Sequence, residues 1–583
     1  MGDSEACATS RSPALSSVGV AVAAVPVLLA LVLVLVAGQR RARLVSLRAR
    51  WGRPVRRTHK LGVLAETHHD RTVHLGEPAI DQRTGDDLLL DAVFVSADRT
   101  ISTLGQDALY HRLHTLGTAD EVRHLEGLVT RFTDDAAARE RAQMALTRLQ
   151  DPNGYNVWWL ADARQLPRHA WHVVFPFLTA GAVCTIALAA GGAVPWSYVL
   201  LPLLANLSAW FLARHQIAAL SLAMRQLAPL AATGEGLAFL ASSGSAIAAD
   251  LPGDALCLRR LKHLSRWLNG DPLMLAHSLE GPALLITALA GIVYEYTNIA
   301  LLLDANGALL AGADLRRRGG TVVRLARAVG DVDCALSVAS WRAERDDWAH
   351  PNFATDTASV DLEDLRHPLL PDAVPNTLLL PLGRGMVITG SNMSGKSTFL
   401  RTVGVNVVLA QRLGTCLASR YEAPFMSVRS CIGRSDDLES GKSYYMTEVE
   451  AVLSLVEAST LAQPHLFLLD ELFRGTNTVE RVSAGCAVLG ALVQPDQGLP
   501  RHIVLAATHD GEVVEILGAG YDACHFGDAI GPDGLVFDFR MRPGPATTRN
   551  AIALLAQCGA PASIVGRATA TAAAMDQARR RAS

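Results

Sequence analysis

Residues 386–398 read MVITGSNMSGKST, and this stretch decides the fold of the carboxyl-terminal part of the chain. The apolar run Met386–Ile388 predicts a buried strand, and Thr398–Leu400 is typical of the start of a helix. Between the two, Gly390–Ser397 matches the pattern G-x-x-x-x-G-K-[ST], in which backbone N–H groups cradle phosphate oxygens. A strand, a glycine-rich loop and a helix in this order predict the phosphate-binding loop of a P-loop nucleoside triphosphatase.

Each position of this loop has an expected role in binding ATP and Mg²⁺. Gly390 and Gly395 permit the tight turn that aims the N–H groups inward. Lys396 is expected to reach the β- and γ-phosphates, and the hydroxyl of Ser397 to be a ligand of Mg²⁺. The residues expected to bind the nucleotide are Gly390, Ser391, Asn392, Met393, Ser394, Gly395, Lys396, Ser397 and Thr398.

Two further apolar runs end in polar residues that complete the expected site. The run His465–Asp470 reads HLFLLD and is followed by Glu471. We expect Asp470 to hold Mg²⁺, and Glu471 to orient or deprotonate the attacking water. The run Ile503–Ala507 leads to His509, and a histidine at the carboxyl edge of a parallel sheet faces the ligand crevice. His509 is therefore expected to contact the γ-phosphate or the attacking water.

The pattern of apolar and polar residues along the chain changes at about Leu365. From there, short β-like runs alternate with helical stretches, which is typical of an α/β domain with a mainly parallel sheet. Residues 61–168 and 214–350 read as largely helical. Apolar residues recur at helical spacing through Leu104, Leu109, Leu113 and Leu116. We therefore expect an α/β P-loop domain at the carboxyl end, preceded by an all-α region that transmembrane helices interrupt.

Composition sets limits on the class of protein. Hydrophobic residues make up 50 % of the chain and charged residues 19 %, which suggests that part of it lies in lipid. The net charge of -3 gives no general attraction for nucleic acid, so any basic surface has to be local. The chain has 9 cysteines and no C-x-x-C pair, so their spacing indicates neither a zinc site nor a disulfide framework.

Two apolar stretches are expected to lie in the membrane. Val18–Gly38 carries no charge and is followed by a basic flank, which is typical of an uncleaved anchor with its amino end outside. The basic flank could equally be a solvated linker. Trp171–Ala213 is broken by glycines and a proline and predicts a membrane hairpin, or alternatively a buried hairpin of a soluble core. Ala283–Leu303 contains Glu295 and Asn298, and we expect it to be a buried or interfacial helix.

These features predict five regions and a location. The protein is expected at the inner (cytoplasmic) membrane, with its ATPase domain in the cytoplasm. The expected regions are 1–60 (anchor and basic flank), 61–168 (helical), 169–215 (membrane hairpin), 216–364 (helical) and 365–583 (ATPase).

Several motifs resemble those of the MutS mismatch-repair ATPases. The resemblance covers residues 365–570 closely and, more weakly, the helical segments 85–160 and 214–350, which are similar to the family's core and lever helices. The motifs that carry it are Arg366–Pro368, Thr389–Thr398, Ser435–Ser443, Asp470–Thr478, Ala507–His509 and Gly544–Ala551. The resemblance implies a homodimer that binds ATP and Mg²⁺. In the family, a serine of the signature loop reaches the γ-phosphate bound by the partner, and Ser443 takes that place here.

The chain also departs from the family. Ser391 and Ser394 stand where the repair proteins often carry Pro and Gly, and Tyr444-Tyr445 replaces a more usual Thr-Phe. The family's mismatch-reading domain inserts a Phe-x-Glu wedge beside the lesion, and no Phe-x-Glu occurs before residue 300 here. The chain is therefore identified as a shortened, membrane-anchored branch of the family, from which mismatch-specific reading is not expected.

Other functions remain open on the sequence alone. DNA may be bound non-specifically through the local basic face formed by Arg259, Arg260, Lys262 and Arg266, although such a face is more often simply solvated. The alternatives are an ABC-type transporter ATPase, a membrane-side ATP-driven machine with an unidentified protein partner and no DNA role, and a scaffold that has lost turnover.

Overall fold

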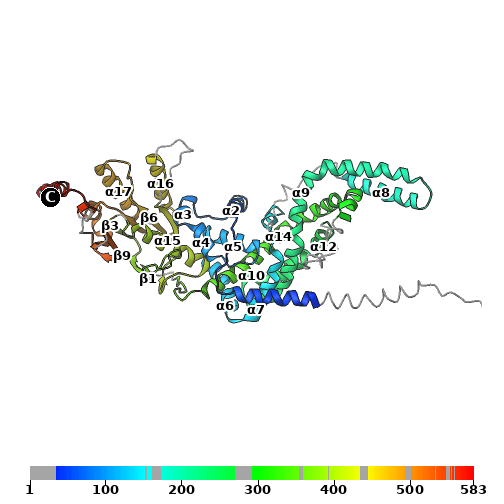
Figure 1. Ribbon diagram of the computed structural model, residues 1–583, viewed down its shortest axis with the longest axis horizontal. Coiled ribbons are helices and arrows are strands. Elements are labelled where there is room, and N and C mark those ends of the chain that lie inside the picture. The colour runs from blue at the N-terminus through cyan, green and yellow to red at the C-terminus, as the bar shows by residue number, and fades with distance from the viewer. Residues whose placement is uncertain are drawn as a thin grey trace, which may run out of the picture. The chain divides into compact units, whose positions relative to one another are not determined.

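The structure is a computed structural model in which the chain forms two compact units, each assembled from separate segments (Figure 1). The helical unit comprises Met1–Trp51, Ala136–Ala238 and Leu251–Ala326, and the α/β unit comprises Gly52–Asp135, Phe239–Asp250 and Arg327–Ser583. The structure describes residues 34–582 except 152–153, 161–172, 269–291, 294, 354–358, 392, 433–443, 494–500, 532–533, 547–551, 553–554 and 557.

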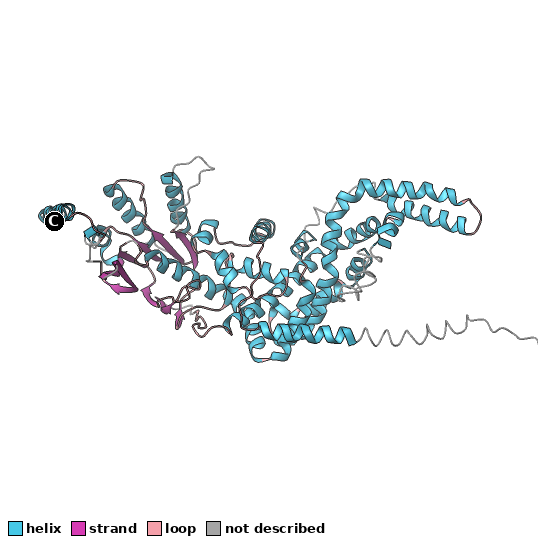
Figure 2. Cartoon of the chain, viewed as in Figure 1, coloured by secondary structure: helices cyan, strands magenta, loops and turns pink. Residues whose placement is uncertain are grey.

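The α/β unit is built on a six-stranded sheet with the strand order β5-β6-β7-β3-β8-β9 (Figure 2). All neighbouring strands are parallel except β9, which runs antiparallel to β8. The strands are β3 (Arg384–Gly390), β5 (Ser427–Cys431), β6 (His465–Asp470), β7 (Ile503–Ala507), β8 (Tyr521–Gly531) and β9 (Gly534–Pro543). The predicted mainly parallel α/β domain is therefore confirmed.

A smaller antiparallel sheet has the strand order β2-β1-β4. Its strands are β1 (Ser359–Leu365), β2 (Asn376–Pro381) and β4 (Arg420–Glu422). The strands of this sheet and of the β8–β9 hairpin were not singled out in the sequence.

Helices cover both faces of the large sheet. Successive residues of a strand point to opposite faces, and β6 shows this directly: Phe467 and Leu469 join a buried cluster on one face, whereas Leu468 packs beside Gly404 of α15 on the other. Because both faces are covered, the strands read as continuous apolar runs. The helices of this half of the unit are α15 (Lys396–Leu413), α16 (Tyr444–Ala458), α17 (Thr478–Val493), α18 (Gly511–Leu517) and α20 (Ala562–Ala582).

The amino-terminal part of the α/β unit is helical, as predicted. Its elements are α2 (Leu61–Leu75), α3 (Gln82–Asp87), α4 (Leu90–Ala97), α5 (Thr103–Leu113), α6 (Ala119–Asp134), η5 (Ala238–Ser243) and α10 (Ala246–Ala249). The apolar spacing noted in the sequence corresponds to α5, in which Leu104, Leu109 and Leu113 are buried.

The short helix α3 docks against β5, which is an edge strand of the large sheet. The N–H of Ser430 donates to Thr84 Oγ1 (3.0 Å), and the N–H of Ile432 donates to the carboxylate of Asp87 (2.8 Å). Arg401 of α15 donates to the backbone oxygen of Asp87 (2.7 Å). An exposed edge strand would present unpaired N–H groups, so these side chains satisfy donors that the sheet leaves over.

A buried arginine links the last turn of α14 (Leu303–Arg342) to the end of α15. Arg342 donates to both carboxylate oxygens of Glu126 (2.7 Å each), to Thr415 Oγ1 (2.8 Å) and to the backbone oxygen of Gly414 (2.7 Å). Arg342 is only 6 % exposed. The guanidinium therefore neutralises a carboxylate and satisfies the carbonyl groups at a helix end that would otherwise lack donors.

The helical unit contains a protruding helical hairpin formed by α8, η4 and α9 (Figure 1). The elements of the unit are the helix at 34–50, α7 (Ala136–Leu146), η1 (Thr147–Leu149), η2 (Gly154–Leu160), α8 (Val174–Ala190), η4 (Trp196–Val199), α9 (Leu200–Leu237), α11 (Leu251–Cys257), α12 (Arg259–Leu268) and the first part of α14.

Among the described residues, no helix combines the length and apolarity that crossing a membrane requires. The hairpin expected over 169–215 is present, but α8 is only 17 residues long, and α9 carries Asn206 and Arg214 and continues to Leu237. Residues 18–33 of the first apolar stretch, and residues 283–291 and 294 of the stretch Ala283–Leu303, lie outside the described residues.

We expect Arg342→Met to destabilise the α/β unit by about 3 kcal/mol, because it leaves Glu126 and the end of α15 without their partner. Arg123→Met is the matched control: Arg123 pairs with Asp120 at the surface, so this change should cost less than about 0.5 kcal/mol. Urea unfolding of the full chain, followed by tryptophan fluorescence, measures both. Equal midpoints for the two variants would contradict the role given to Arg342.

Candidate nucleotide site

The phosphate loop joins the end of β3 to the start of α15, as the sequence predicts. Gly390 has φ 143° and Gly395 has φ 110°, values that residues with a side chain rarely adopt. A Cβ at Gly390 would lie 2.7 Å from the backbone oxygen of Phe526, so the neighbouring strand leaves no room for one. The loop thus requires both glycines, and it leads directly into the amino terminus of α15, where N–H groups attract anions.

Lys396 is buried inside the curve of the loop. Its Nζ donates to the backbone oxygens of Gly390 and Ser391, at 2.9 Å each. Phosphate oxygens carry more negative charge than carbonyl oxygens and are the stronger acceptors for an ammonium group. The side chain is therefore positioned to exchange these two carbonyl groups for the phosphates of a nucleotide.

Ser397 and Asp470 meet in the pair predicted to bind Mg²⁺. The hydroxyl of Ser397 donates to Asp470 Oδ2 at 2.5 Å. Burial raises the pKa of the Asp470 carboxyl, while the bond from Ser397 and the charge of Lys396 oppose that rise. A buried carboxylate beside a hydroxyl suits a hard cation. In the described part of the chain, no group of three or more His, Cys, Asp and Glu side chains could hold a metal.

Glu471 and His509 lie in direct contact at the ends of β6 and β7. The carboxylate of Glu471 bonds to His509 Nε2 and accepts from Arg474 Nη1 (2.6 Å). His509 Nδ1 lies 3.2 Å from the backbone oxygen of Gly390, which can only accept. The hydrogen bond from His509 lowers the pKa of Glu471 despite partial burial. Glu471 is therefore held as a carboxylate beside the phosphate loop, as a base requires.

Two polar contacts that the sequence reading did not include hold these residues in place. Arg481 of α17 makes two bonds of 2.8 Å to Asp510, the residue that follows His509. Glu448 of α16 accepts from the N–H of Phe473, close to Glu471. Glu471 itself has φ 52°, a strained backbone conformation that is found most often at functional sites.

A hollow of about 370 Å³ adjoins the start of α15. Its walls are largely apolar, with polar groups at Thr398, Thr402 and Asp372. The rings that line it are those of Phe399, Phe526 and Phe539. A flat heteroaromatic base next to a phosphate loop requires this combination of aromatic walls and a few polar groups. We therefore identify this hollow as the candidate pocket for the nucleobase.

Asn376 fixes Phe539 at the edge of this hollow. Its Nδ2 donates to the backbone oxygen of Phe539 (2.9 Å), and its Oδ1 accepts from the N–H of Met541 (2.7 Å). The register between β8 and β9 shifts at this point, and Phe539 has φ 55°. Nothing in the spacing of the sequence could indicate this contact, because it joins residues 163 positions apart and depends on a bulge.

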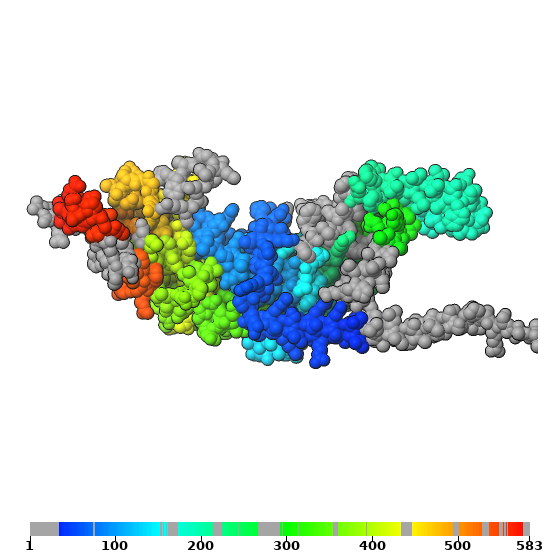
Figure 3. All heavy atoms as spheres, viewed as in Figure 1, coloured from blue at the N-terminus to red at the C-terminus, as the bar shows by residue number. Residues whose placement is uncertain are grey.

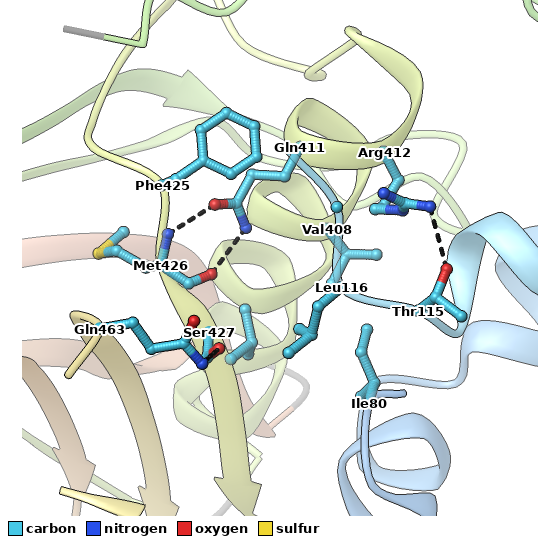
Figure 4. Close-up of a pocket in the computed structure, with 12 residues that line it drawn as sticks. Ile80, Thr115, Leu116, Val408, Gln411, Arg412, Phe425, Met426, Ser427 and Gln463 are labelled. Atoms are coloured by element: carbon cyan, nitrogen blue, oxygen red, sulfur yellow. Dashed lines mark hydrogen bonds between the residues drawn. The ribbon is translucent and has the colours of Figure 1, made fainter. Parts of the chain in front are cut away.

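A second, smaller hollow of about 150 Å³ lies near the other end of α15 (Figure 4). Gln411 spans it and makes two hydrogen bonds to the backbone of Met426 (2.8 and 2.6 Å). Arg412 donates to Thr115 Oγ1 (3.0 Å), so α15 is also joined there to the helical segment that precedes it. The amide and guanidinium groups drawn in Figure 4 are paired within the protein, and this hollow is a gap in packing rather than a candidate site.

The structure brings most of the predicted residues together. Lys396, Ser397, Asp470, Glu471 and His509 surround the mouth of the phosphate loop. Met393 is exposed, whereas Ser394 is buried. Two predicted residues, Asn392 and Ser443, lie outside the described residues, so their roles stay predictions.

Comparison with known proteins agrees with this geometry. Residues 386–576 match the family MutS domain V. The chain is 35 % identical over 252 residues to "DNA mismatch repair protein MutS 2" of Halobacterium salinarum, a match that covers 42 % of this chain and 28 % of that relative. It is 32 % identical over 264 residues to "DNA mismatch repair protein MutS" of Thermus aquaticus, covering 45 % of this chain and 31 % of the relative.

The matched part thus spans less than a third of the length of these curated relatives. The carboxyl-terminal part of the chain is a P-loop ATPase domain of the MutS type.

We expect Phe539→Ala to raise the KM for ATP about tenfold with a smaller effect on kcat, because stacking on an aromatic ring contributes about 1–3 kcal/mol per base. Val536→Ala is the control, since Val536 is an exposed residue of the same strand that does not line the hollow. Steady-state hydrolysis at varied ATP concentration measures both constants. An unchanged KM in Phe539→Ala would remove the hollow as the base pocket.

Proposed function

We propose that this protein is a homodimeric, Mg²⁺-dependent MutS-like ATPase that serves DNA mismatch repair or a related process. The observation that carries the proposal is the convergence of a phosphate loop, a Ser397–Asp470 pair and a Glu471–His509 pair at one edge of the sheet. A scaffold that had lost turnover would not need to keep all of these groups in working geometry.

In this proposal each group has one chemical task. Lys396 and the N–H groups of the loop bind the phosphates, and Ser397 with Asp470 holds Mg²⁺, which neutralises charge on the β- and γ-phosphates. Glu471, ionised beside His509, accepts a proton from the attacking water. His509 touches both Glu471 and the loop oxygen of Gly390, so a change at the γ-phosphate would alter both contacts.

The homodimer is proposed from the resemblance of residues 435–443 to the family's signature loop. Ser443 of each chain would contact the γ-phosphate bound by the other chain, so each site would be complete only in the dimer. ATP binding would then close the dimer, and hydrolysis would release it.

The process served is proposed from the names of the relatives, which are DNA mismatch repair proteins. A second candidate is a membrane-side machine that has kept the ATPase domain and acts on a protein partner. The observation that favours it is the apolar surface of the α8–α9 hairpin, on which Phe177 is 73 % exposed and Leu212 is 69 % exposed. An ABC-type transporter finds less support, because the described residues contain no helix suited to crossing a membrane.

We further propose that the protein resides at the inner face of the cytoplasmic membrane, with its ATPase domain in the cytoplasm. The support comes from the uncharged stretch Val18–Gly38 and from the basic residues that follow it. Basic flanks of apolar segments remain on the cytoplasmic side.

We expect Lys396→Ala to abolish ATP hydrolysis through lost phosphate binding, and Glu471→Gln to abolish hydrolysis while ATP still binds and holds the dimer closed. The measurements are phosphate release and dimer lifetime, each with duplex, mismatched and branched DNA and without DNA. Stimulation by DNA supports a repair-related process. Hydrolysis that is indifferent to every DNA but lost in Lys396→Ala favours the membrane-side machine. Unchanged hydrolysis in both variants would refute the proposed site.

Mixing two inactive variants tests the composite site. Lys396→Ala and Ser443→Ala disable different halves of each site, so a mixed dimer contains one intact site and one doubly damaged site. Random pairing of equal amounts should restore about a quarter of the wild-type rate. Each variant alone should remain inactive at the same total concentration, and a mixture as inactive as its components would argue against sharing of the site between chains.

A further inference from the structure

The α8–α9 hairpin of the helical unit has an apolar outer surface. The hairpin forms a lobe of its own at one end of that unit (Figure 3). Its exposed large side chains are Val174, Phe177, Val183, Leu188, Trp196, Tyr198, Leu200, Leu201, Leu204, Leu207, Phe211 and Leu212. No Asp, Glu, Lys or Arg occurs between residues 169 and 213. An apolar surface of this kind on a soluble protein marks a place that something else covers.

Two polar side chains of the hairpin point inward. Asn206 is fully buried and donates to the backbone oxygen of Ala300. Thr179 donates to the backbone oxygen of Leu301 (2.8 Å) and accepts from Asn306 Nδ2 (2.7 Å). The amide of the hairpin is therefore paired inside the helical unit, whereas most large side chains on the outside are apolar. Polar side chains that face the interior of a helix bundle are typical of helices immersed in lipid.

The two halves of α9 differ sharply in what surrounds them. Near the hairpin tip, Leu201 and Leu204 are 67 % and 59 % exposed. In the second half of the same helix, Leu227 and Leu230 are buried within the helical unit. Arg214 lies between these regions, is exposed, and places its guanidinium 4.2 Å from the ring centre of Phe211. A basic residue thus follows the exposed apolar side chains Phe211 and Leu212, as expected where a helix leaves hydrocarbon for headgroups.

The net charge of the helical unit indicates which kind of surface covers the hairpin. Its segments contain 21 Lys and Arg against 12 Asp and Glu, a net charge of +9, whereas the whole chain carries -3. The α/β unit therefore carries -12. A basic unit that bears an apolar hairpin complements a membrane with anionic headgroups, which attracts Lys and Arg near its surface.

We propose that the α8–α9 hairpin is immersed in the hydrocarbon of a membrane rich in anionic lipid, that it enters and leaves from the same side, and that α8 does not cross the bilayer. The length of α8 fits this arrangement, since 17 residues extend for about 25 Å and a bilayer core is about 30 Å thick. This inference rests on the membrane location proposed above and names the lipid-contacting element and the lipid class.

Two native cysteines report on the hairpin without any substitution. Cys184 lies on α8 and Cys558 lies in the α/β unit, and both are exposed. The full-length protein is reconstituted into vesicles of phosphatidylglycerol and phosphatidylcholine and treated with a water-soluble maleimide, and labelled peptides are identified by mass spectrometry. We expect Cys184 to be protected and Cys558 to react. Dissolving the vesicles in sodium dodecyl sulfate, which also denatures the protein, should make Cys184 reactive.

Labelling of Cys184 in the same vesicles also tests the apolar surface, because the proposed anchor Val18–Gly38 would keep every variant on the vesicle. A triple variant, Phe177→Asp with Leu204→Asp and Phe211→Asp, places charge on the proposed lipid-facing surface and should raise the labelling of Cys184 about tenfold or more. A control variant carries Leu379→Asp, Val479→Asp and Ile516→Asp, at positions of similar exposure in the α/β unit. The control should protect Cys184 as the wild type does, and both variants should keep Lys396-dependent ATP hydrolysis.

The outcomes separate this inference from the proposals on which it rests. If Cys184 of the wild type reacts in vesicles, or the hairpin variant protects Cys184 as well as the wild type does, the hairpin is not the lipid contact, although the membrane location stands. If Cys184 is protected without lipid and the protection depends on protein concentration, a second copy covers the hairpin and the inference is overturned. Equal protection of Cys184 in purely zwitterionic vesicles would refute the preference for anionic lipid. If the wild-type protein does not hydrolyse ATP, the proposed function is refuted, and the inference about the hairpin and lipid is unaffected.

Discussion

The parallel register of β6, β7 and β3 is the constraint on which the nucleotide site depends. Asp470 pairs with Ala507, and Ala507 pairs in turn with Ile388, so three strands end at the same level of the sheet. The polar residues that follow each strand therefore emerge side by side, although they lie far apart in the sequence. The N–H of Glu471 donates to the backbone oxygen of Ala507 (2.9 Å), which extends the ladder by one residue, and Glu471 has φ 52°. A slip of one residue in any of these strands would move its side chains to the opposite face of the sheet and separate the metal pair from the phosphate loop.

The helical segments of the α/β unit also support the nucleotide site, because they satisfy polar groups at both ends of α15. Lys396 and Ser397 begin this helix, and Arg342 binds the backbone at its other end through Gly414. One turn after the phosphate loop, Arg401 bonds to the backbone of Asp87, whose carboxylate in turn binds edge strand β5. A movement of the phosphate loop would therefore strain contacts with helices that are distant in sequence. Buried, fully paired groups have few alternative arrangements, and for this reason they can transmit such a movement.

The sequence was sufficient to predict the catalytic edge of the sheet and insufficient for the groups that support it. Lys396, Ser397, Asp470 and Glu471 could be predicted because each follows an apolar strand in a pattern whose chemistry depends on spacing alone. Phe539 and Asn376 could not, since they meet through a bulge in β9 and a separate antiparallel sheet, and no local pattern encodes that pairing. The salt bridge from Arg481 to Asp510 is likewise a contact between two elements that only the folded sheet brings together. The helical hairpin was predicted from its apolarity and from the glycines and proline that interrupt it, and α8 ends at Ala190, just before Gly191.

The exposed apolar side chains of the α8–α9 hairpin are unfavourable in water, and the structure of the hairpin indicates an environment in which they are favourable. Burying a large aliphatic or aromatic side chain contributes about 1.5–3 kcal/mol relative to leaving it in water. A dozen such side chains on the outside of α8, η4 and α9 would therefore forgo about 18–36 kcal/mol of stabilisation if they remained hydrated, which exceeds the net stability of a typical domain. At the same time, Asn206 and Thr179 occupy interior positions where aliphatic side chains would pack more favourably in a water-soluble protein. Both features become favourable together in hydrocarbon, where the outer surface needs no water and the inner hydrogen bonds hold the two helices to the start of α14.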